Sequence, residues 1–225
     1  MLQAVILAGG LGTRMRPYTE TVPKPMLAVR GRPFIEHQLE LLREAGFRRF
    51  LLLVGWLGEQ IEEHLGDGTR FGVEIRYSYE LTPLGTGGAL RNAADMLEPE
   101  FLLVNGDTLL AIDYPGLVRR AQSLPAMVLI AASPTAAPGN LQVANDGAIV
   151  GYSKRQPAGR HVDAGVAVVR REAVDLIPPD RVCSFEEEVL PKLIEAGQAF
   201  AAITESNFFD MGTPAGLAAL EAHLG

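Results

Sequence analysis

The sequence has few residues that could form disulfides or bind zinc, and few features of a membrane protein: it contains one cysteine, four histidines and no long apolar run. The lone cysteine, Cys183, excludes an internal disulfide and predicts a protein of the reducing cytoplasm. No apolar stretch reaches the length of a membrane span, so a membrane partner is not expected. The apolar run near the N-terminus has no basic flank, which argues against a signal peptide. No histidine pair has metal-ligand spacing, so a zinc site is not expected.

The charge of the chain is acidic overall and basic in one place. The formal net charge of the 225 residues is −7, yet residues 9–32 carry five basic residues against one acid, Glu20. Such a local excess in an acidic chain favours a small polyanion over a nucleic acid as the partner. The hydrophobic share of 48% suffices for one well-buried domain, and no Ser/Gly-rich linker divides the chain. We therefore expect a single domain over residues 1–225.

A glycine-rich loop follows the first apolar run, residues 4–7, which predicts a buried strand. Gly9, Gly10 and Gly12 let the backbone turn tightly and approach a ligand. Free amides in such a loop suit a phosphate chain, and Arg14 adds a cation. A P-loop is excluded because no Gly-Lys-Ser/Thr closes the loop, and a dinucleotide fingerprint is excluded because no third glycine follows.

Five short motifs in order resemble the sugar nucleotidyltransferases. The first is Gly-Gly-x-Gly-Thr-Arg at 9–14, followed by Lys-Pro at 24–25. The later ones are Leu-Gly-Thr-Gly-Gly-Ala-Leu at 84–90, Val-Asn-Gly-Asp at 104–107, Asp-Ala-Gly-Val at 163–166 and Phe-Asp-Met-Gly-Thr-Pro at 209–214. Enzymes of this family join a nucleoside triphosphate to a sugar 1-phosphate and release pyrophosphate. The resemblance therefore implies these two substrates as partners and Mg²⁺ as the cofactor. The sequence leaves open whether the chain forms a homo-oligomer.

The order of elements predicts an α/β fold. Strands are expected near 2–8, 49–54, 73–78, 101–104 and 126–132, alternating with helices near 33–45, 57–65, 86–97 and 115–123. This alternation predicts a Rossmann-like open, mainly parallel sheet with helices on both faces. After residue 135 we expect a hairpin around Asp146-Gly147, a strand near 162–169, and helices capped by Ser184 and Thr213. Residues 1–135 would bind the nucleotide, and residues 136–225 would add a smaller antiparallel sugar-phosphate part. No β-helix domain is expected.

The resemblance also implies roles for individual residues. An in-line displacement at the α-phosphate needs positioning and charge neutralisation more than a covalent nucleophile. Arg14, Lys24 and Asp107 are the predicted catalytic residues: Arg14 matches the family arginine on the triphosphate, and Lys24 matches the lysine on the α-phosphate and sugar phosphate. Asp107 and Asp210 match the magnesium ligands, and two carboxylates with phosphate oxygens and water form a usual magnesium shell.

The remaining predicted contacts divide between the two substrates. Lys154 stands in Ser-Lys-Arg-Gln where relatives carry Glu-Lys-Pro, so Arg155 stays an alternative for the sugar-phosphate lysine. The predicted nucleotide contacts are Leu7, Ala8, Gly9, Gly10, Gly12, Thr13, Arg14, Glu80, Gly85, Thr86 and Gly106. The predicted sugar-phosphate contacts are Lys24, Gly139, Lys154, Asp163 and Gly165.

The base and the sugar are predicted from finer resemblance. Segments 54–59, 185–191 and 209–214 resemble guanylyltransferases acting on D-glycero-α-D-manno-heptose 1-phosphate or mannose 1-phosphate. Glu80 precedes Gly85 by five residues. Guanine presents two adjacent hydrogen-bond donors, and a carboxylate can accept from both, which favours GTP. Residues 56–79 look equally like N-acetylmuramate 1-phosphate uridylyltransferases, which is the alternative. A non-catalytic sugar-nucleotide-binding regulator is a third reading, although such relatives tend to lose the lysine or the metal carboxylates.

Overall fold

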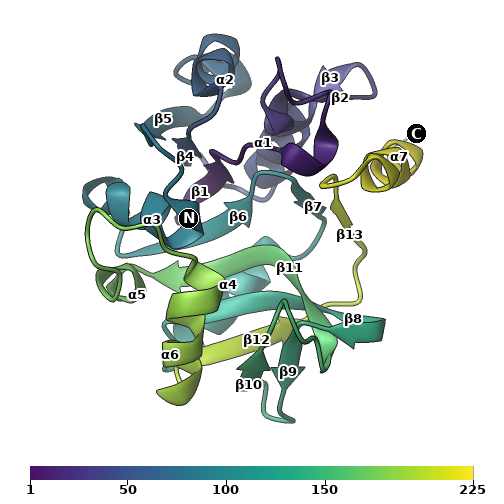
Figure 1. The fold of residues 1–225 in the computed structure, drawn as a ribbon. Helices are drawn as coiled ribbons and strands as arrows, with labels where there is room; N and C mark the ends of the chain where they lie inside the picture. The colour runs from purple at the N-terminus through teal and green to yellow at the C-terminus, as the bar shows by residue number, and fades with distance from the viewer. Residues whose placement is uncertain (225) are drawn as a thin grey trace.

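The computed structural model describes residues 1–224, and one mixed nine-stranded sheet forms its centre (Figure 1). Parallel strands make one half of the sheet, with β1 paired to both β4 and β6 and β4 paired to β5. Their bounds are β1 Gln3–Ala8, β4 Arg49–Val54, β5 Glu74–Tyr79 and β6 Glu100–Asn105. Because both faces of this half are covered, β4 is apolar and buried on five successive residues, 50–54. The predicted open, mainly parallel sheet is confirmed.

Helices cover both faces of the sheet, as predicted. One core joins α1, α2 and α4 to alternate strand residues such as Ala4 and Ile6, and a second core joins α3, α5 and α6 to Val5, Leu51 and Leu53. The helices are α1 Phe34–Glu44, α2 Gly58–Leu65, α3 Gly85–Asn92, α4 Tyr114–Ser123, α5 Glu172–Asp175, α6 Leu190–Glu195 and α7 Pro214–His223. Each helix among residues 1–224 is too short or too polar to span a bilayer.

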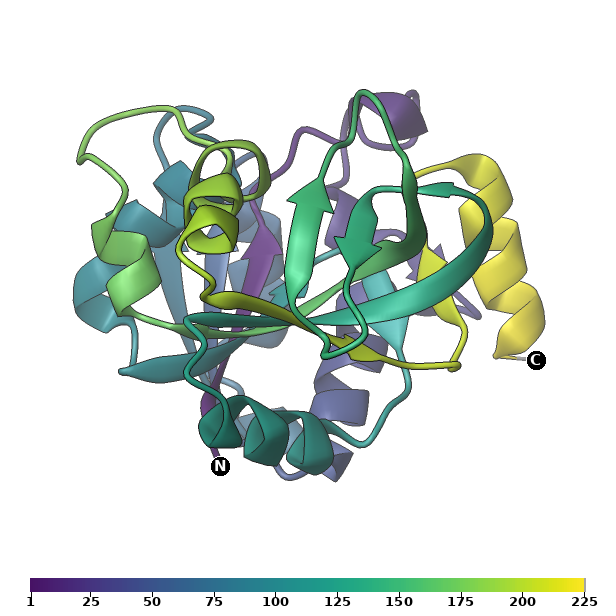
Figure 2. The same cartoon turned by 90° about the horizontal axis from the view of Figure 1, so that it is seen from below.

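Later strands continue the sheet rather than form a separate layer (Figure 2). Strand β11 runs antiparallel to β6 and to β8, and β12 runs parallel to β8. Their bounds are β8 Val128–Gly139, β9 Leu141–Val143, β10 Ile149–Tyr152, β11 Gly159–Arg170 and β12 Ala199–Ile203. The predicted hairpin is present as β9–β10. Because β8 crosses residue 135 without interruption, the two predicted parts share one sheet.

Two small ribbons hold the C-terminal helix beside the sheet. Strand β7, Thr108–Leu110, pairs antiparallel with β13, Phe208–Asp210, and β2, Ala28–Val29, pairs with β3, Arg32–Pro33. A third core of Val29, Phe34, Leu109, Met211 and Leu220 packs these ribbons against α7. Pairing of β7 with β13 brings segments about 100 residues apart to one edge.

Caps begin the two C-terminal helices. The Thr213 hydroxyl accepts from the amide of Gly216, as the sequence predicted. Ser184 accepts from the amide of Glu187, but Glu188 rather than Glu187 returns the bond to the Ser184 amide. The expected capping box is thus displaced by one residue, because 185–189 form a π turn that inserts an extra residue before α6. Helix α1 begins at Phe34, one residue later than predicted, and Pro33 precedes it as its cap.

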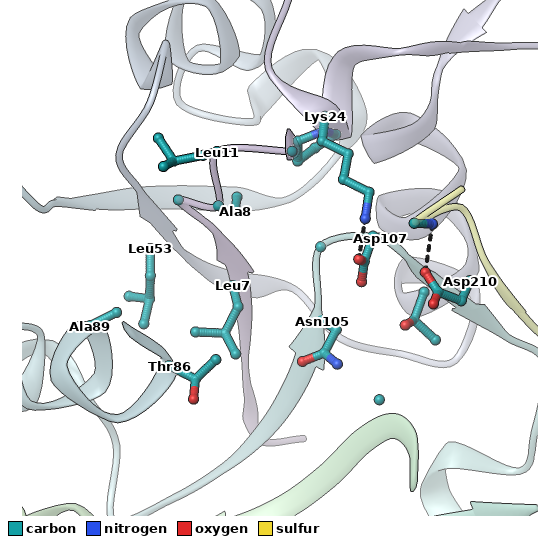
Figure 3. A pocket seen from close by; sticks show the side chains of 18 of the residues that line it. Leu7, Ala8, Leu11, Lys24, Leu53, Thr86, Ala89, Asn105, Asp107 and Asp210 are labelled. Carbon is teal, nitrogen blue, oxygen red and sulfur yellow. Dashed lines mark hydrogen bonds and ion pairs between the residues drawn. The ribbon is translucent and has the colours of Figure 1, made fainter. Parts of the chain in front are cut away.

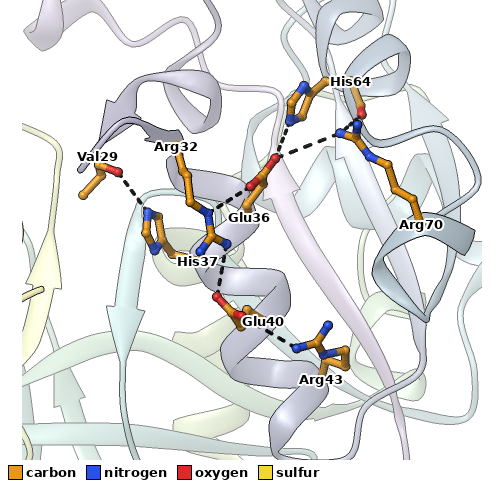
Figure 4. A network of polar contacts seen from close by, with 8 residues as sticks. All are labelled: Val29, Arg32, Glu36, His37, Glu40, Arg43, His64 and Arg70. Atoms are coloured by element: carbon orange, nitrogen blue, oxygen red, sulfur yellow. Dashed lines mark hydrogen bonds and ion pairs between the residues drawn. The ribbon is translucent and has the colours of Figure 1, made fainter.

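A polar network ties α1 to α2 near the carboxyl edge of the sheet (Figure 4). Glu36 on α1 lies 2.7 Å from the Nε2 atom of His64 and accepts from Arg32 at 3.1 Å. Burial acts to raise the pKa of Glu36, but the hydrogen bonds with His64 and Arg32 outweigh it and hold the pKa below its usual value. The network therefore fixes the two helices that flank the parallel strands.

Candidate active site

A cavity of about 540 Å³ lies at the carboxyl ends of the parallel strands (Figure 3). Strand β1 contributes Leu7 and Ala8, and residues directly after β5 and β6 contribute Glu80 and Asp107. Open α/β sheets place ligand groups at this edge. Of the predicted site residues, these line the cavity: Leu7, Ala8, Gly9, Gly10, Gly12, Thr13, Arg14, Lys24, Glu80, Gly85, Thr86, Gly106, Asp107, Lys154, Asp163, Gly165 and Asp210.

Gly139 is the predicted sugar contact that the structure does not bring into this cavity. It ends β8 and pairs with Gly159 of β11. A Cβ atom at residue 139 would lie 2.1 Å from the carbonyl oxygen of His161. The close approach of the two strands therefore requires glycine at this position.

The glycine loop is held in place by contacts with buried side chains. Gly12 has a φ of 61°, and a Cβ there would lie 2.8 Å from the side chain of Thr19. The buried Thr19 donates its hydroxyl to the Gly12 carbonyl at 2.8 Å. Met15, in the short turn after the loop, is fully buried. The loop is thus held against buried side chains at the cavity wall, and Gly12 provides the left-handed backbone conformation that the turn requires.

Lys24 points toward Asp107 across the cavity, and the two side chains form an ion pair (Figure 3). Lys24 opens a short turn, Lys24–Met26, and its side chain is only 12% exposed. Asp107 lies in the turn between β6 and β7. Buried Gln38 of α1 fixes this turn by donating from Nε2 to the carbonyls of Asn105 at 2.8 Å and Thr108 at 2.5 Å.

Asp210 reaches the same wall of the cavity from the far end of the chain. Its strand, β13, pairs with β7 so that Asp210 lies opposite Thr108, next to Asp107 in the sequence. Oδ1 of Asp210 accepts from the amide of Gly212 at 2.6 Å. The guanidinium of Arg14 packs against Gly212, where a Cβ would approach Nη2 to 2.8 Å. Arg14, Asp107 and Asp210 therefore line one region.

The donor set of this region fits Mg²⁺. Asp107 and Asp210 provide carboxylate oxygens, whereas no group of three His, Cys, Asp or Glu side chains suited to a metal ion occurs within residues 1–224. Mg²⁺ is usually held by one or two carboxylates, with substrate phosphates and water as its other ligands. Two carboxylates beside a phosphate-accepting loop match that requirement.

Glu80 lies at another wall, against the glycine loop. Its Oε2 accepts from the amide of Leu84 at 3.1 Å, and a Cβ at Gly9 would come within 2.6 Å of Oε1. Burial raises the pKa of Glu80, which the Leu84 hydrogen bond partly opposes. The Leu84 bond holds the carboxylate at the start of α3, near Gly85 and Thr86.

The other side of the cavity is formed by the second half of the chain. Lys154 lines the cavity, with Nζ 3.7 Å from Oε2 of Glu186. Arg155 does not line it: its side chain is 87% exposed and faces Glu187 at 3.8 Å. The structure therefore brings Lys154, and not Arg155, to the cavity.

Asp163 lies in β11 beside Gly165, whose amide donates to Oδ1 at 2.8 Å. Burial raises the pKa of Asp163 to about 6, which the Gly165 hydrogen bond opposes and the charge of Glu186 reinforces. The ammonium of Lys154 acts in the opposite direction. Asp163 is therefore a carboxylate whose ionisation is resisted by its surroundings.

Several residues of the lining were not predicted from the sequence. Among them are Asn105, Thr108, Glu186 and Gly212. Asn105 and Gly212 lie within the recognised motifs at 104–107 and 209–214, and Thr108 directly follows the first of them, so these motifs were the available signal. Glu186 lies in segment 185–191, which resembles guanylyltransferases, but nothing local indicates that its carboxylate accepts from Thr86 at 2.7 Å.

The fold and the cavity define an open α/β protein with cations, glycine amides and paired carboxylates at the carboxyl edge of its sheet. The sequence profile of the nucleotidyl transferase family matches residues 3–224, and the chain belongs to this family.

Similar proteins bear names from within the family. The chain is 35% identical over 221 residues to the mannose-1-phosphate guanylyltransferase of Mycobacterium tuberculosis, covering 95% of this chain and 62% of that protein. It is 30% identical over 215 residues to the D-glycero-alpha-D-manno-heptose 1-phosphate guanylyltransferase of Campylobacter jejuni, covering 95% and 96%. It is 47% identical over 128 residues to the N-acetylmuramate alpha-1-phosphate uridylyltransferase of Neisseria meningitidis, covering 55% and 54%. With the first and third of these, the chain spans less than two thirds of the relative's length.

Solved structures agree with the fold. HddC from Yersinia pseudotuberculosis superimposes with a TM-score of 0.87 at 29% identity, and the match covers 100% of both chains. A second structure of that protein, with a TM-score of 0.86, is complexed with GMP-PN.

Proposed function

We propose that this chain transfers a nucleotidyl group from a nucleoside triphosphate to a sugar 1-phosphate and releases pyrophosphate. The observation that carries the proposal is the meeting of the glycine loop, Lys24, Asp107 and Asp210 in one cavity. These groups supply amides and cations for phosphates and carboxylates for a metal ion, which is what a phosphoryl displacement requires. The names of the relatives point to the same reaction class.

The proposed roles follow from where the side chains lie. The amides of residues 9–12 and the guanidinium of Arg14 would bind the triphosphate, since both line the cavity beside β1. Lys24 would neutralise the α-phosphate while a sugar-phosphate oxygen attacks the α-phosphorus. The bond from the α-phosphorus to the pyrophosphate oxygen breaks, and pyrophosphate leaves. Lys154 would hold the phosphate of the sugar.

Asp107 and Asp210 would hold Mg²⁺ in this proposal. When bound, the ion supplies charge neutralisation at the α-phosphate and lowers the barrier to displacement. Lys24 pairs with Asp107 in the free protein, so this lysine would exchange its carboxylate for a phosphate when the substrates bind.

GTP with D-glycero-α-D-manno-heptose 1-phosphate or mannose 1-phosphate is the proposed substrate pair. Two guanylyltransferase relatives and the GMP-PN complex of HddC support it. The carboxylate of Glu80, which lines the cavity near Gly85, supports it from the structure, because it can accept from the adjacent donors of guanine. We also propose a cytoplasmic location, because Cys183 is a buried free thiol.

The N-acetylmuramate 1-phosphate uridylyltransferase activity is the second candidate. It is favoured by one observation, the 47% identity with the Neisseria meningitidis protein over 55% of this chain. A purely regulatory role is disfavoured because Lys24, Asp107 and Asp210 are all present and line one cavity.

A pyrophosphate-release screen tests these proposals. It crosses GTP, UTP, dTTP, CTP and ATP with the 1-phosphates of mannose, D-glycero-α-D-manno-heptose, glucose and N-acetylmuramate, with Mg²⁺ present. We expect turnover of GTP with the heptose or mannose compound. Turnover of UTP with N-acetylmuramate 1-phosphate would replace the substrate assignment. Binding of a sugar nucleotide without pyrophosphate release from any pair would replace catalysis by the regulatory role.

A further inference from the structure

Glu186 lines the cavity where the turn before α6 contacts the start of α3. It is the second residue of the π turn at 185–189, and its side chain is 14% exposed. Oε2 accepts from the hydroxyls of Thr86 at 2.7 Å and Ser184 at 2.9 Å and lies 3.7 Å from Nζ of Lys154. Within residues 1–224 all its hydrogen bonds thus fall on Oε2, which leaves Oε1 as the oxygen able to accept from a ligand.

A second carboxylate shares this side of the cavity. Asp163 also lines the cavity, and its Oδ1 accepts from the Gly165 amide at 2.8 Å. After burial, which is the main cause, the negative charge of Glu186 contributes to the raised pKa of Asp163. The two carboxylates therefore repel each other electrostatically.

Charge on this side of the cavity is unbalanced once a phosphate is bound. Lys154 is the cation that faces Glu186, and the proposed function assigns it to the sugar phosphate. A phosphate on Lys154 would leave Glu186 and Asp163 facing the remainder of the sugar. Ionised carboxylates accept hydrogen bonds from hydroxyl groups and repel another anion at short range.

We propose that Glu186, together with Asp163, determines which sugar 1-phosphates are accepted: those whose ring substituents are neutral hydroxyl groups, and not those that carry an acidic substituent. This inference rests on the proposed function and narrows its substrate class. It also separates the two candidate activities, because N-acetylmuramate carries a carboxylate whereas heptose and mannose do not.

The test compares one neutral sugar 1-phosphate with its 6-carboxylate counterpart, for example mannose 1-phosphate with mannuronate 1-phosphate. The sugar is the best neutral substrate of the screen, and kcat/KM is measured for both compounds at fixed nucleotide. We expect the wild type to prefer the neutral compound and Glu186→Gln to reduce that preference about tenfold, because one repelling charge is removed. Glutamine keeps an oxygen for Thr86 and Ser184, which favours retention of the fold.

Glu187→Gln is the matched control. It removes the same charge one residue further along, from a side chain that faces Arg155 and does not line the cavity, and the preference should stay as in the wild type. Circular dichroism checks folding of each variant. Should Glu186→Gln not fold, Asp163→Asn carries the same comparison and the same expectation.

The outcomes separate this assignment from the proposed function. Equal losses of kcat/KM for both compounds in Glu186→Gln, or an unchanged preference, would show that Glu186 only supports the structure and would overturn the assignment. An unchanged preference in Asp163→Asn, or a wild type that accepts the acidic compound as well as the neutral one, would also overturn it. A wild type that releases no pyrophosphate with any sugar 1-phosphate would overturn the proposed function itself and this assignment with it.

Discussion

Replacing Asp163 by asparagine should make the protein more stable at neutral pH. The folded protein holds the pKa of this carboxyl near 6, against an ordinary value of 3.8. Because the folded-state pKa is raised, protonation stabilises the fold fully below the ordinary pKa, and that stability is lost as the pH rises through about 6. The difference between the two pKa values corresponds to at most about 3 kcal/mol, of which about 2 kcal/mol falls between pH 4.5 and 7.5. Asparagine keeps an oxygen for the Gly165 amide and does not titrate.

Urea unfolding of the ligand-free protein at pH 4.5 and 7.5 measures this difference. The free energy of unfolding of Asp163→Asn, minus that of the wild type, should be more favourable at pH 7.5 than at pH 4.5 by about 2 kcal/mol. Subtracting the wild type cancels the titration of all other groups. Asp180→Asn, which removes an exposed carboxylate, is the control and should follow the wild type. A difference that does not change with pH, or changes in the opposite sense, would refute the assignment of a raised pKa to Asp163.

Four further substitutions test the catalytic side of the cavity. Asp107→Asn and Asp210→Asn should each abolish most turnover with little change in unfolding, since a lost magnesium ligand removes several kcal/mol of charge stabilisation; near-normal rates at modest Mg²⁺ would contradict the metal assignment. Lys24→Ala should lower kcat more than it weakens nucleotide binding, measured by calorimetry, and equal losses would make Lys24 a ground-state anchor. Gln38→Leu should reduce the free energy of unfolding by about 2 kcal/mol in urea melts, because the carbonyls of Asn105 and Thr108 lose a donor; a wild-type melt would show that the β6–β7 turn is held without it.

The elements that could be predicted from the sequence are those whose residues carry their own signal. Strand β4 occupies the predicted residues 49–54. Its run of large apolar side chains is buried on both faces of the sheet, so the sequence pattern alone indicates the strand. Strand β12, residues 199–203, was not predicted, because Ala-Phe-Ala-Ala-Ile contains three alanines and alanine has little β propensity. Its pairing with β8 decides the conformation. The strands β7 and β13 were not predicted either, because each has three residues and forms by pairing with the other.

The cavity divides in the same way. Arg14, Lys24 and Asp107 stand in short motifs that contain glycine or proline, so the resemblance carried by these motifs was sufficient to predict them. Gln38 and Glu186 act through contacts across 70 and 100 residues of sequence, with Thr108 and Thr86 respectively. No local pattern encodes such a contact, because it exists only after the sheet has brought the segments together.

Each lysine of the cavity is matched to a carboxylate in the free protein, Lys24 to Asp107 and Lys154 to Glu186. Lys24 is largely shielded from water, and such a charge is costly unless it is paired. Lys154 is half exposed, so its pair with Glu186 is the weaker of the two. A phosphate that takes one lysine leaves a carboxylate that needs a new partner. Beside Asp107 the second carboxylate of Asp210 makes a divalent cation the natural replacement, whereas beside Glu186 the hydroxyl groups of a sugar can serve. In the proposed function, the pairing of charges in the free protein would therefore favour a metal ion beside Asp107 and Asp210 and a neutral sugar beside Glu186.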